Sequence, residues 1–183
     1  AFKVHSPFVF DLYKRVILDK TAYPDYEIVE GLRKQLCAKK SLIETTDFGT
    51  GASRKQYVTR IRKLGEITRQ SSVGPKIGRL LYRLVKEAKP GNILEIGTSV
   101  GLSTIYMALA SPGSRIVSME GCASVAEIAQ ENFNSPGIDN VELILGNFDT
   151  VLGPALEEAG RVDFVFLVGN HREKPTLDYF IRI

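Results

Sequence analysis

The chain of 183 residues is long enough for one domain with its own core, and 44% hydrophobic with 25% charged residues is ordinary for a globular protein. No apolar run approaches the roughly 18–20 residues of a membrane-spanning helix, and the first residues lack the features of a secretory signal peptide. The two cysteines, Cys37 and Cys122, supply neither a disulfide framework nor metal-site spacing. We therefore expect a cytoplasmic protein with no membrane partner.

The net charge of +3 conceals a strongly basic segment. Residues 52–89 hold eleven Lys and Arg side chains and two acidic ones, so the segment carries +9 and the rest of the chain −6. Such a segment could attract an anionic substrate, a nucleic acid or another protein. Lys and Arg are also common on exposed helix faces, and we favour this simpler interpretation.

Residues 1–74 are predicted to form a mostly helical N-terminal extension that could act as a lid. Apolar side chains recur at helical spacing in "PFVFDLYKRVIL" and in "IVEGLRKQL". The stretch "ETTDFGTGAS" at 44–53 has the composition of an exposed loop, in which glycine supplies backbone freedom. Residues 54–69 and 75–88 are predicted to be two basic amphipathic helices.

From residue 90 onward, short apolar runs alternate with helical segments at 101–110, 123–134 and 151–159. The runs are rich in β-branched and aromatic residues, as strands buried on both faces must be. They are "NILEIG" (92–97), "RIVSME" (115–120), "VELILG" (141–146) and "VDFVFLV" (162–168). We predict an α/β domain over 75–183, with a doubly wound, Rossmann-like, mostly parallel sheet and helices on both faces.

In such sheets, ligands bind at the carboxyl ends of the strands. The first strand runs through Glu95 into the turn "GTSVGLS" at 97–103. A dinucleotide fingerprint has denser glycines, and a phosphate-binding loop has Gly-Lys-Ser or Gly-Lys-Thr, which this turn lacks. The turn suits a ligand that approaches the backbone closely without a diphosphate. A nicotinamide-dependent dehydrogenase is therefore disfavoured.

Polar side chains also follow the next two predicted strands. Glu120 closes the second strand, where a carboxylate can accept hydrogen bonds from both hydroxyls of a ribose. After the third strand, Asn147 offers an amide for an adenine edge and Phe148 offers an aromatic face. Each signal is weak alone, because acidic residues are mostly surface residues. Together they predict a nucleoside site at one edge of the sheet.

These motifs resemble a known enzyme family. "ILEIGTSVGLST", "VSMEG", "ELILGNF" and "DFVFLVGNH" are similar to the successive motifs of class I S-adenosylmethionine-dependent methyltransferases, of the small-molecule O-methyltransferase type related to catechol methyltransferases. "HSPFVFDLY" and "GNHREKPTLDYF" resemble a bacterial branch of that group. The resemblance covers residues 75–181 well and the N-terminal helices loosely. It implies S-adenosyl-L-methionine as cofactor and a small-molecule hydroxyl as methyl acceptor.

The resemblance also implies roles for individual residues. Gly97 and Gly101 would border the methionine part of the cofactor. The amino and carboxylate groups of that methionine would meet Glu95, Thr98, Ser99 and Ser103. Glu120 would bind the ribose, and Asn147 and Phe148 would meet the adenine. The complete predicted cofactor site comprises Glu95, Gly97, Thr98, Ser99, Gly101, Ser103, Glu120, Gly121, Asn147, Phe148 and Gly169.

Methyl transfer to a hydroxyl requires a group that takes its proton. His171, just after the fourth strand, is the predicted base, since an imidazole titrates near neutral pH, and Asn170 lies beside it. The alternative is that His171 only packs or caps at the strand end. Catechol-type relatives would hold a divalent cation with an aspartate where this chain has Val168, which cannot bind one. We therefore predict a metal-independent mechanism, and ordinary surface for His5.

The family's sheet has seven strands, and only four are predicted here. The chain ends in "TLDYFIRI", which suits the helix after the fourth strand. Without a neighbour, that strand would be an open apolar edge, which proteins avoid. We expect that C-terminal strands are missing from this chain, or that a second chain, for instance in a homodimer, covers the edge.

Two other functions remain open. A nucleic-acid methyltransferase could grip phosphates with the basic segment 52–89, although the Asn/Asp-Pro-Pro-Tyr/Phe signature of base methylation is missing. A non-catalytic protein could bind S-adenosylmethionine as a sensor or partner module. Neither the acceptor's identity nor the oligomeric state is encoded in a motif of this chain.

Overall fold

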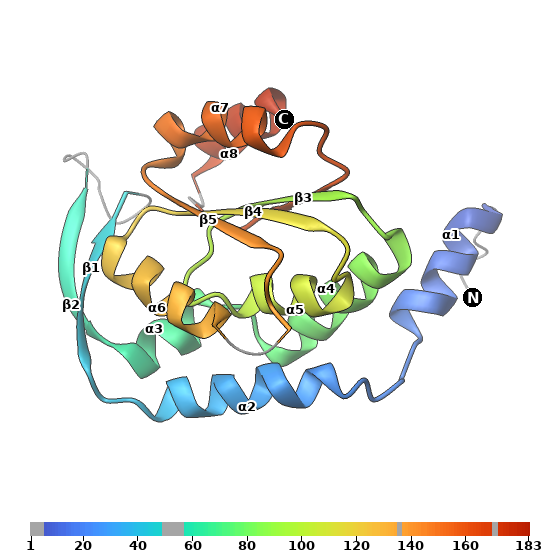
Figure 1. Ribbon diagram of the computed structural model, residues 1–183, viewed down its shortest axis with the longest axis horizontal. Helices are drawn as coiled ribbons and strands as arrows, with labels where there is room; N and C mark the ends of the chain where they lie inside the picture. Colours follow the sequence, from blue (N-terminus) through green and yellow to red (C-terminus); the bar gives the residue numbers. More distant parts are fainter. Residues whose placement is uncertain (1–5, 49–56, 135–136, 170–171) are drawn as a thin grey trace.

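The computed structural model describes residues 6–48, 57–134, 137–169 and 172–183. Its centre is a parallel sheet with the strand order β5-β4-β3-β6 (Figure 1). The four strands are β3 (Asn92–Ile96), β4 (Arg115–Glu120), β5 (Val141–Leu145) and β6 (Phe164–Leu167). All four lie where the apolar runs predicted them, and every neighbouring pair is parallel.

Helices cover both faces of this sheet, as predicted (Figure 1). One layer contains α4 (Pro75–Ala88), α5 (Leu102–Ala110) and α6 (Ala123–Phe133), and the other contains α7 (Phe148–Ala159) and α8 (Glu173–Arg182).

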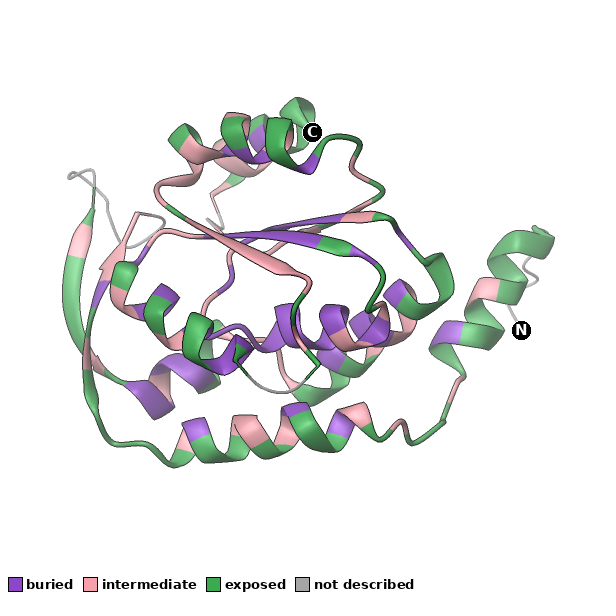
Figure 2. Ribbon diagram, viewed as in Figure 1, coloured by how far each residue is buried: buried purple, intermediate pink, exposed green. Residues whose placement is uncertain are grey.

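Successive side chains of β3 alternate between the two layers. Ile93 belongs to the hydrophobic cluster on the α4 and α5 side, whereas Leu94 and Ile96 belong to the cluster that contains Leu152 of α7. Buried residues concentrate in the central strands β3 and β4 and in α5 (Figure 2).

The N-terminal part begins with α1 (Pro7–Leu12), the π-helical turn η1 (Tyr13–Ile17) and the long helix α2 (Asp25–Ala38). α2 packs against the sheet's helical layer, and its Tyr26 shares one core with Tyr82 of α4. Glu30 of α2 accepts two hydrogen bonds from the guanidinium of Arg79, at 2.6 and 2.8 Å. α2 and the sheet domain are thus packed together, and a boundary at residue 74 stays a prediction.

The next segment differs from the sequence-based prediction. β1 (Leu42–Asp47) and β2 (Val58–Lys63) form an antiparallel hairpin, followed by α3 (Leu64–Ser71). The loop predicted from residue 44 is therefore wrong over 44–47, and the helix predicted over 54–69 is wrong over 58–63. In β2, Val58, Arg60 and Arg62 alternate with Thr59, Ile61 and Lys63. Cross-strand pairing of this β-branched run outweighs its weak helical pattern.

In the part of the chain that the structure describes, no helix is both long and apolar enough to span a membrane. β5 and β6 are the outer strands of the described sheet.

Gly78 is predicted to be essential for the contact between α4 and α5. A Cβ atom at this position would lie 2.2 Å from Cε2 of Tyr106, so Gly78→Ala must displace a buried ring. We expect a loss of about 1–3 kcal/mol in the free energy of unfolding, measured by urea denaturation. Gly31→Ala is the matched control, because Gly31 lies in α2 with no atom near its added Cβ.

Helix propensity alone favours alanine at both positions by roughly 0.5–1 kcal/mol. Gly31→Ala should therefore be neutral or stabilising. Equal effects of the two substitutions would contradict the assigned contact between Gly78 and Tyr106.

Candidate active site

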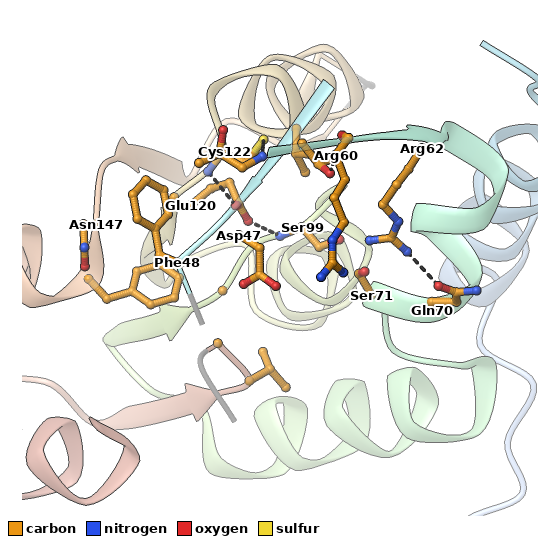
Figure 3. Close-up of a pocket in the computed structure, with 18 of the residues that line it drawn as sticks. Asp47, Phe48, Arg60, Arg62, Gln70, Ser71, Ser99, Glu120, Cys122 and Asn147 are labelled. Atoms are coloured by element: carbon orange, nitrogen blue, oxygen red, sulfur yellow. Dashed lines mark hydrogen bonds between the residues drawn. The ribbon is translucent and has the colours of Figure 1, made fainter. Parts of the chain in front are cut away.

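A cavity of about 340 Å³ lies at the carboxyl ends of the sheet strands, beneath the β1–β2 hairpin (Figure 3). This volume falls in the range of small-molecule sites, about 300–1,000 Å³. Seven of the predicted cofactor residues line it: Gly97, Ser99, Glu120, Gly121, Asn147, Phe148 and Gly169. They come from four different strand ends, so the parallel sheet is what gathers them.

The turn after β3 presents backbone to the cavity. The amide groups of Gly97 and Thr98 both donate to the carbonyl oxygen of Met119 at 3.0 Å, which ties the turn to β4. The φ angles of Gly97 and Ser99 are +105° and +51°, in the left-handed region that side chains disfavour. A Cβ atom on Gly97 would lie 2.7 Å from the backbone nitrogen of Gly169. Glycine therefore permits the close approach of two strand-end turns at this position.

Glu120 is held at the cavity by two backbone groups. Its Oε2 accepts from the amide of Ser99 at 2.8 Å, and its Oε1 accepts from the amide of Cys122 at 2.9 Å. Burial raises the pKa of the Glu120 carboxyl, and these hydrogen bonds oppose that rise. A carboxylate has about four acceptor positions, so two amide contacts leave further acceptor capacity. Glu120 is thus oriented and able to accept hydrogen bonds from a diol.

Asn147 and Phe148 lie just after β5, the third of the predicted strands. The Oδ1 atom of Asn147 accepts from the amide of Asp149 at 3.0 Å, so this side chain also caps α7. The Phe148 ring packs edge-on against Tyr179, with 6.3 Å between ring centroids. A Cβ atom on Gly169 would come within 2.3 Å of the Phe148 ring. The ring is therefore held between α8 and the turn after β6.

Four residues of the predicted cofactor set do not line the cavity: Glu95, Thr98, Gly101 and Ser103. Glu95 is fully buried and points toward α5, because it shares a strand face with Ile93. Its carboxyl group accepts from the hydroxyls of Ser103, Thr104 and Ser118 at 2.5–2.6 Å.

The hydroxyl of Thr98 also bonds to Ser118 in this interior network, at 2.5 Å. At Gly101, a Cβ atom would meet the ring of Phe133. Glu95, Thr98, Gly101 and Ser103 therefore lie in the protein interior behind the turn and do not line the cavity.

The cavity wall formed by the hairpin was missed by the sequence analysis. Thr45, Asp47, Phe48, Arg60 and Arg62 all line the cavity from this side. The available signal was the β-branched content of "LIETTD" and "VTRIRK", on either side of a glycine-containing stretch. The hairpin is attached to α6, because the amide of Thr46 donates to Sγ of Cys122 at 3.3 Å.

The predicted catalytic residues His171 and Asn170, and also His5, lie outside the described residues. Val168, two residues before Asn170, lines the cavity. Within the described ranges, no group of three or more His, Cys, Asp or Glu side chains could hold a metal ion. The metal-independent mechanism stays a prediction.

The buried Glu95 should make stability depend on pH. Burial raises its pKa from the model-peptide value of 4.5 to about 7. The folded protein then holds a proton that the unfolded chain releases, so stability falls as pH rises between these two values. We expect a loss of roughly 2–3 kcal/mol between pH 5 and pH 8 from this group.

Glu95→Gln should remove that part of the pH dependence in urea unfolding, since the amide cannot ionise. Glu127→Gln, at an exposed position of α6, is the control and should leave the dependence intact. An identical pH profile for wild type and Glu95→Gln would contradict the raised pKa.

The profile of a family described as "Methyltransferase domain" matches residues 94–183. Among curated relatives, the catechol O-methyltransferase of Niastella koreensis is 35% identical over 112 residues, covering 60% of this chain and 50% of that protein. The transmembrane O-methyltransferase homolog of Mus musculus is 37% identical over 117 residues, covering 61% and 43%. The chain thus spans about half the length of the curated relatives it matches.

Solved structures of O-methyltransferases are also similar to this chain. The O-methyltransferase TomG of Streptomyces achromogenes, in complex with S-adenosylmethionine, is 32% identical with a TM-score of 0.55, covering 61% of this chain and 52% of that one. The O-methyltransferase of Bacillus cereus, at 22% identity and a TM-score of 0.58, covers 94% and 66% and shows the shared fold. Residues 94–183 thus match a methyltransferase domain. With the glycine turn, the strand-end carboxylate and the strand order already described, the chain is similar to class I O-methyltransferases that use S-adenosylmethionine.

Proposed function

We propose that the protein transfers a methyl group from S-adenosyl-L-methionine to a hydroxyl group of a small molecule, without a metal ion. The observation that carries this proposal is the Glu120 carboxylate, held at 2.8 and 2.9 Å by two amide groups beside the backbone turn at Gly97. The relation to TomG, which was solved with S-adenosylmethionine, supports the same cofactor.

The residues of the cavity fit this cofactor. Glu120 would accept hydrogen bonds from the ribose hydroxyls, and Phe148 would contact the adenine ring with its aromatic face. The missing side chain of Gly97 lets the turns after β3 and β6 approach each other beside the cavity. When bound, S-adenosylmethionine supplies a methyl group activated by a neighbouring sulfonium. The protein's contribution is mainly to hold donor and acceptor in line.

The acceptor proton requires a base. We assign it to His171, with Asn170 beside it, because both follow directly on Gly169 at the end of the fourth strand. Val168, at the position where the catechol methyltransferase resemblance would have a metal-binding aspartate, supports a reaction that needs no divalent cation.

The alternative of a nucleic-acid methyltransferase is weakened because several cations of the basic segment 52–89 bind other parts of the same chain. Arg79 pairs with Glu30, Arg83 donates to the Val16 carbonyl at 2.6 Å, and Arg69 donates to the Cys37 carbonyl at 2.6 Å. These cations hold elements together and do not form one continuous free face. A cytoplasmic location and a homodimer stay predictions.

Calorimetric titration tests the cofactor directly. Wild type should bind S-adenosylhomocysteine and not NAD. Glu120→Gln should weaken S-adenosylhomocysteine binding about tenfold or more, because charged hydrogen bonds to the ribose are lost. Glu131→Gln, an exposed acid of α6, is the control and should bind like wild type. Preference for NAD, or equal affinity in Glu120→Gln, would overturn the proposed site.

A panel of hydroxyl-bearing metabolites then tests the reaction in the presence of a chelator. We expect formation of S-adenosylhomocysteine with at least one acceptor. His171→Ala should lower kcat about 10²–10⁴-fold while cofactor binding is retained. Turnover that requires added Mg²⁺, or full activity of His171→Ala, would contradict the mechanism.

A further inference from the structure

The cavity has a cationic end that the predicted site residues do not explain. Arg60 and Arg62 are two positions apart on β2, so they lie on the same face of the hairpin, and both line the cavity. Figure 3 shows both guanidinium groups directed from the hairpin into the cavity.

The alternation of this strand is opposite to what packing alone would select. Ile61, between the two arginines, is 70% exposed, and Leu42 at the end of β1 is 67% exposed. On β2, Ile61 therefore faces solvent, whereas the flanking Arg60 and Arg62 line the cavity. Arg60 is exposed and Arg62 is half-buried, and Asp47 supplies one negative charge on the same face, so this end of the cavity carries a net positive charge. The arrangement indicates an anionic ligand group.

The two guanidinium groups are available for such a group. None of the ion pairs formed among the described residues includes Arg60 or Arg62. The Nη2 atom of Arg62 donates to Oε1 of Gln70 on α3 at 2.7 Å, which orients the side chain and leaves its other N–H groups. A guanidinium presents paired donors that match the two oxygens of a carboxylate.

The position of the pair identifies the ligand group. Asn147 lies at one end of the cavity, Glu120 and Ser99 lie between, and the arginines lie at the opposite end (Figure 3). A cofactor with its ribose at Glu120 would therefore extend its methionine part toward β2. Meanwhile Glu95, Thr98 and Ser103, which the resemblance assigned to the methionine head, do not line the cavity.

We propose that Arg60 and Arg62 form the subsite for the methionine carboxylate of S-adenosylmethionine, so that the β1–β2 hairpin completes the cofactor site. The proposal rests on the proposed function. Asp47 lies on the same hairpin face and also lines the cavity, so both signs of charge are present at this end.

The test compares two ligands by calorimetry on the full chain. S-adenosylhomocysteine carries the amino acid carboxylate, whereas 5′-methylthioadenosine keeps the nucleoside and thioether and lacks it. Wild type should prefer S-adenosylhomocysteine. Arg60→Gln and Arg62→Gln should each lower its affinity about tenfold, through the loss of a charged hydrogen bond, and leave methylthioadenosine affinity unchanged. The double substitution should abolish the preference.

Lys63→Gln is the matched control. Lys63 is on the same strand, faces away from the cavity and pairs only with Glu66, 3.7 Å away, among the described ion pairs. Both affinities should stay at the wild-type value in this variant, and urea unfolding should show that all variants are folded. Lys63→Gln thus separates the carboxylate contact from a general change in surface charge.

Unchanged S-adenosylhomocysteine affinity in the double variant would overturn the proposal. A higher KM for an anionic acceptor in that variant would then indicate that the arginines bind the acceptor and not the cofactor. An equal loss of affinity for both ligands would also overturn it, because the arginines would then support the hairpin and not a carboxylate. Failure of wild type to bind either ligand would reject the proposed function itself, which is a different outcome.

Discussion

The site depends on one carboxylate that joins three segments. Glu120 accepts from Ser99 in the turn after β3 and from Cys122 at the start of α6. Cys122 in turn receives the amide of Thr46 through its sulfur, so the β1–β2 hairpin is anchored to the same point. Because Glu120 ends a central strand of a buried sheet, its backbone has little freedom. The cavity takes its shape from this connection.

A second carboxyl group, Glu95, lies in the interior below the same turn. Three hydroxyl groups surround it, and the nearby charge of Glu120 adds to the burial that raises the pKa of the Glu95 carboxyl. The two acids therefore have different roles. Glu95 satisfies buried hydroxyls of α5 and β4 and supports the turn, whereas Glu120 keeps acceptor capacity toward the cavity.

The two ends of the cavity come from different parts of the chain. The strand ends of the sheet supply the backbone turn, the carboxylate and the aromatic ring that suit a nucleoside. The hairpin, from the N-terminal part, supplies the guanidinium groups that suit a carboxylate. On this view the N-terminal segment contributes binding groups, which goes beyond the lid expected from the sequence.

Local sequence determined most of the sheet domain. Continuous β-branched runs predicted the four strands, helical periodicity predicted the helices between them, and the parallel arrangement then required Glu120, Asn147 and Phe148 to lie at one edge. The tertiary structure alone decided the directions of Glu95 and the two hairpin arginines. A strand buried on both faces has no polar side to reveal that Glu95 faces α5. The directions of the hairpin side chains follow from the register between β1 and β2, which the weak strand pattern of either segment alone does not encode.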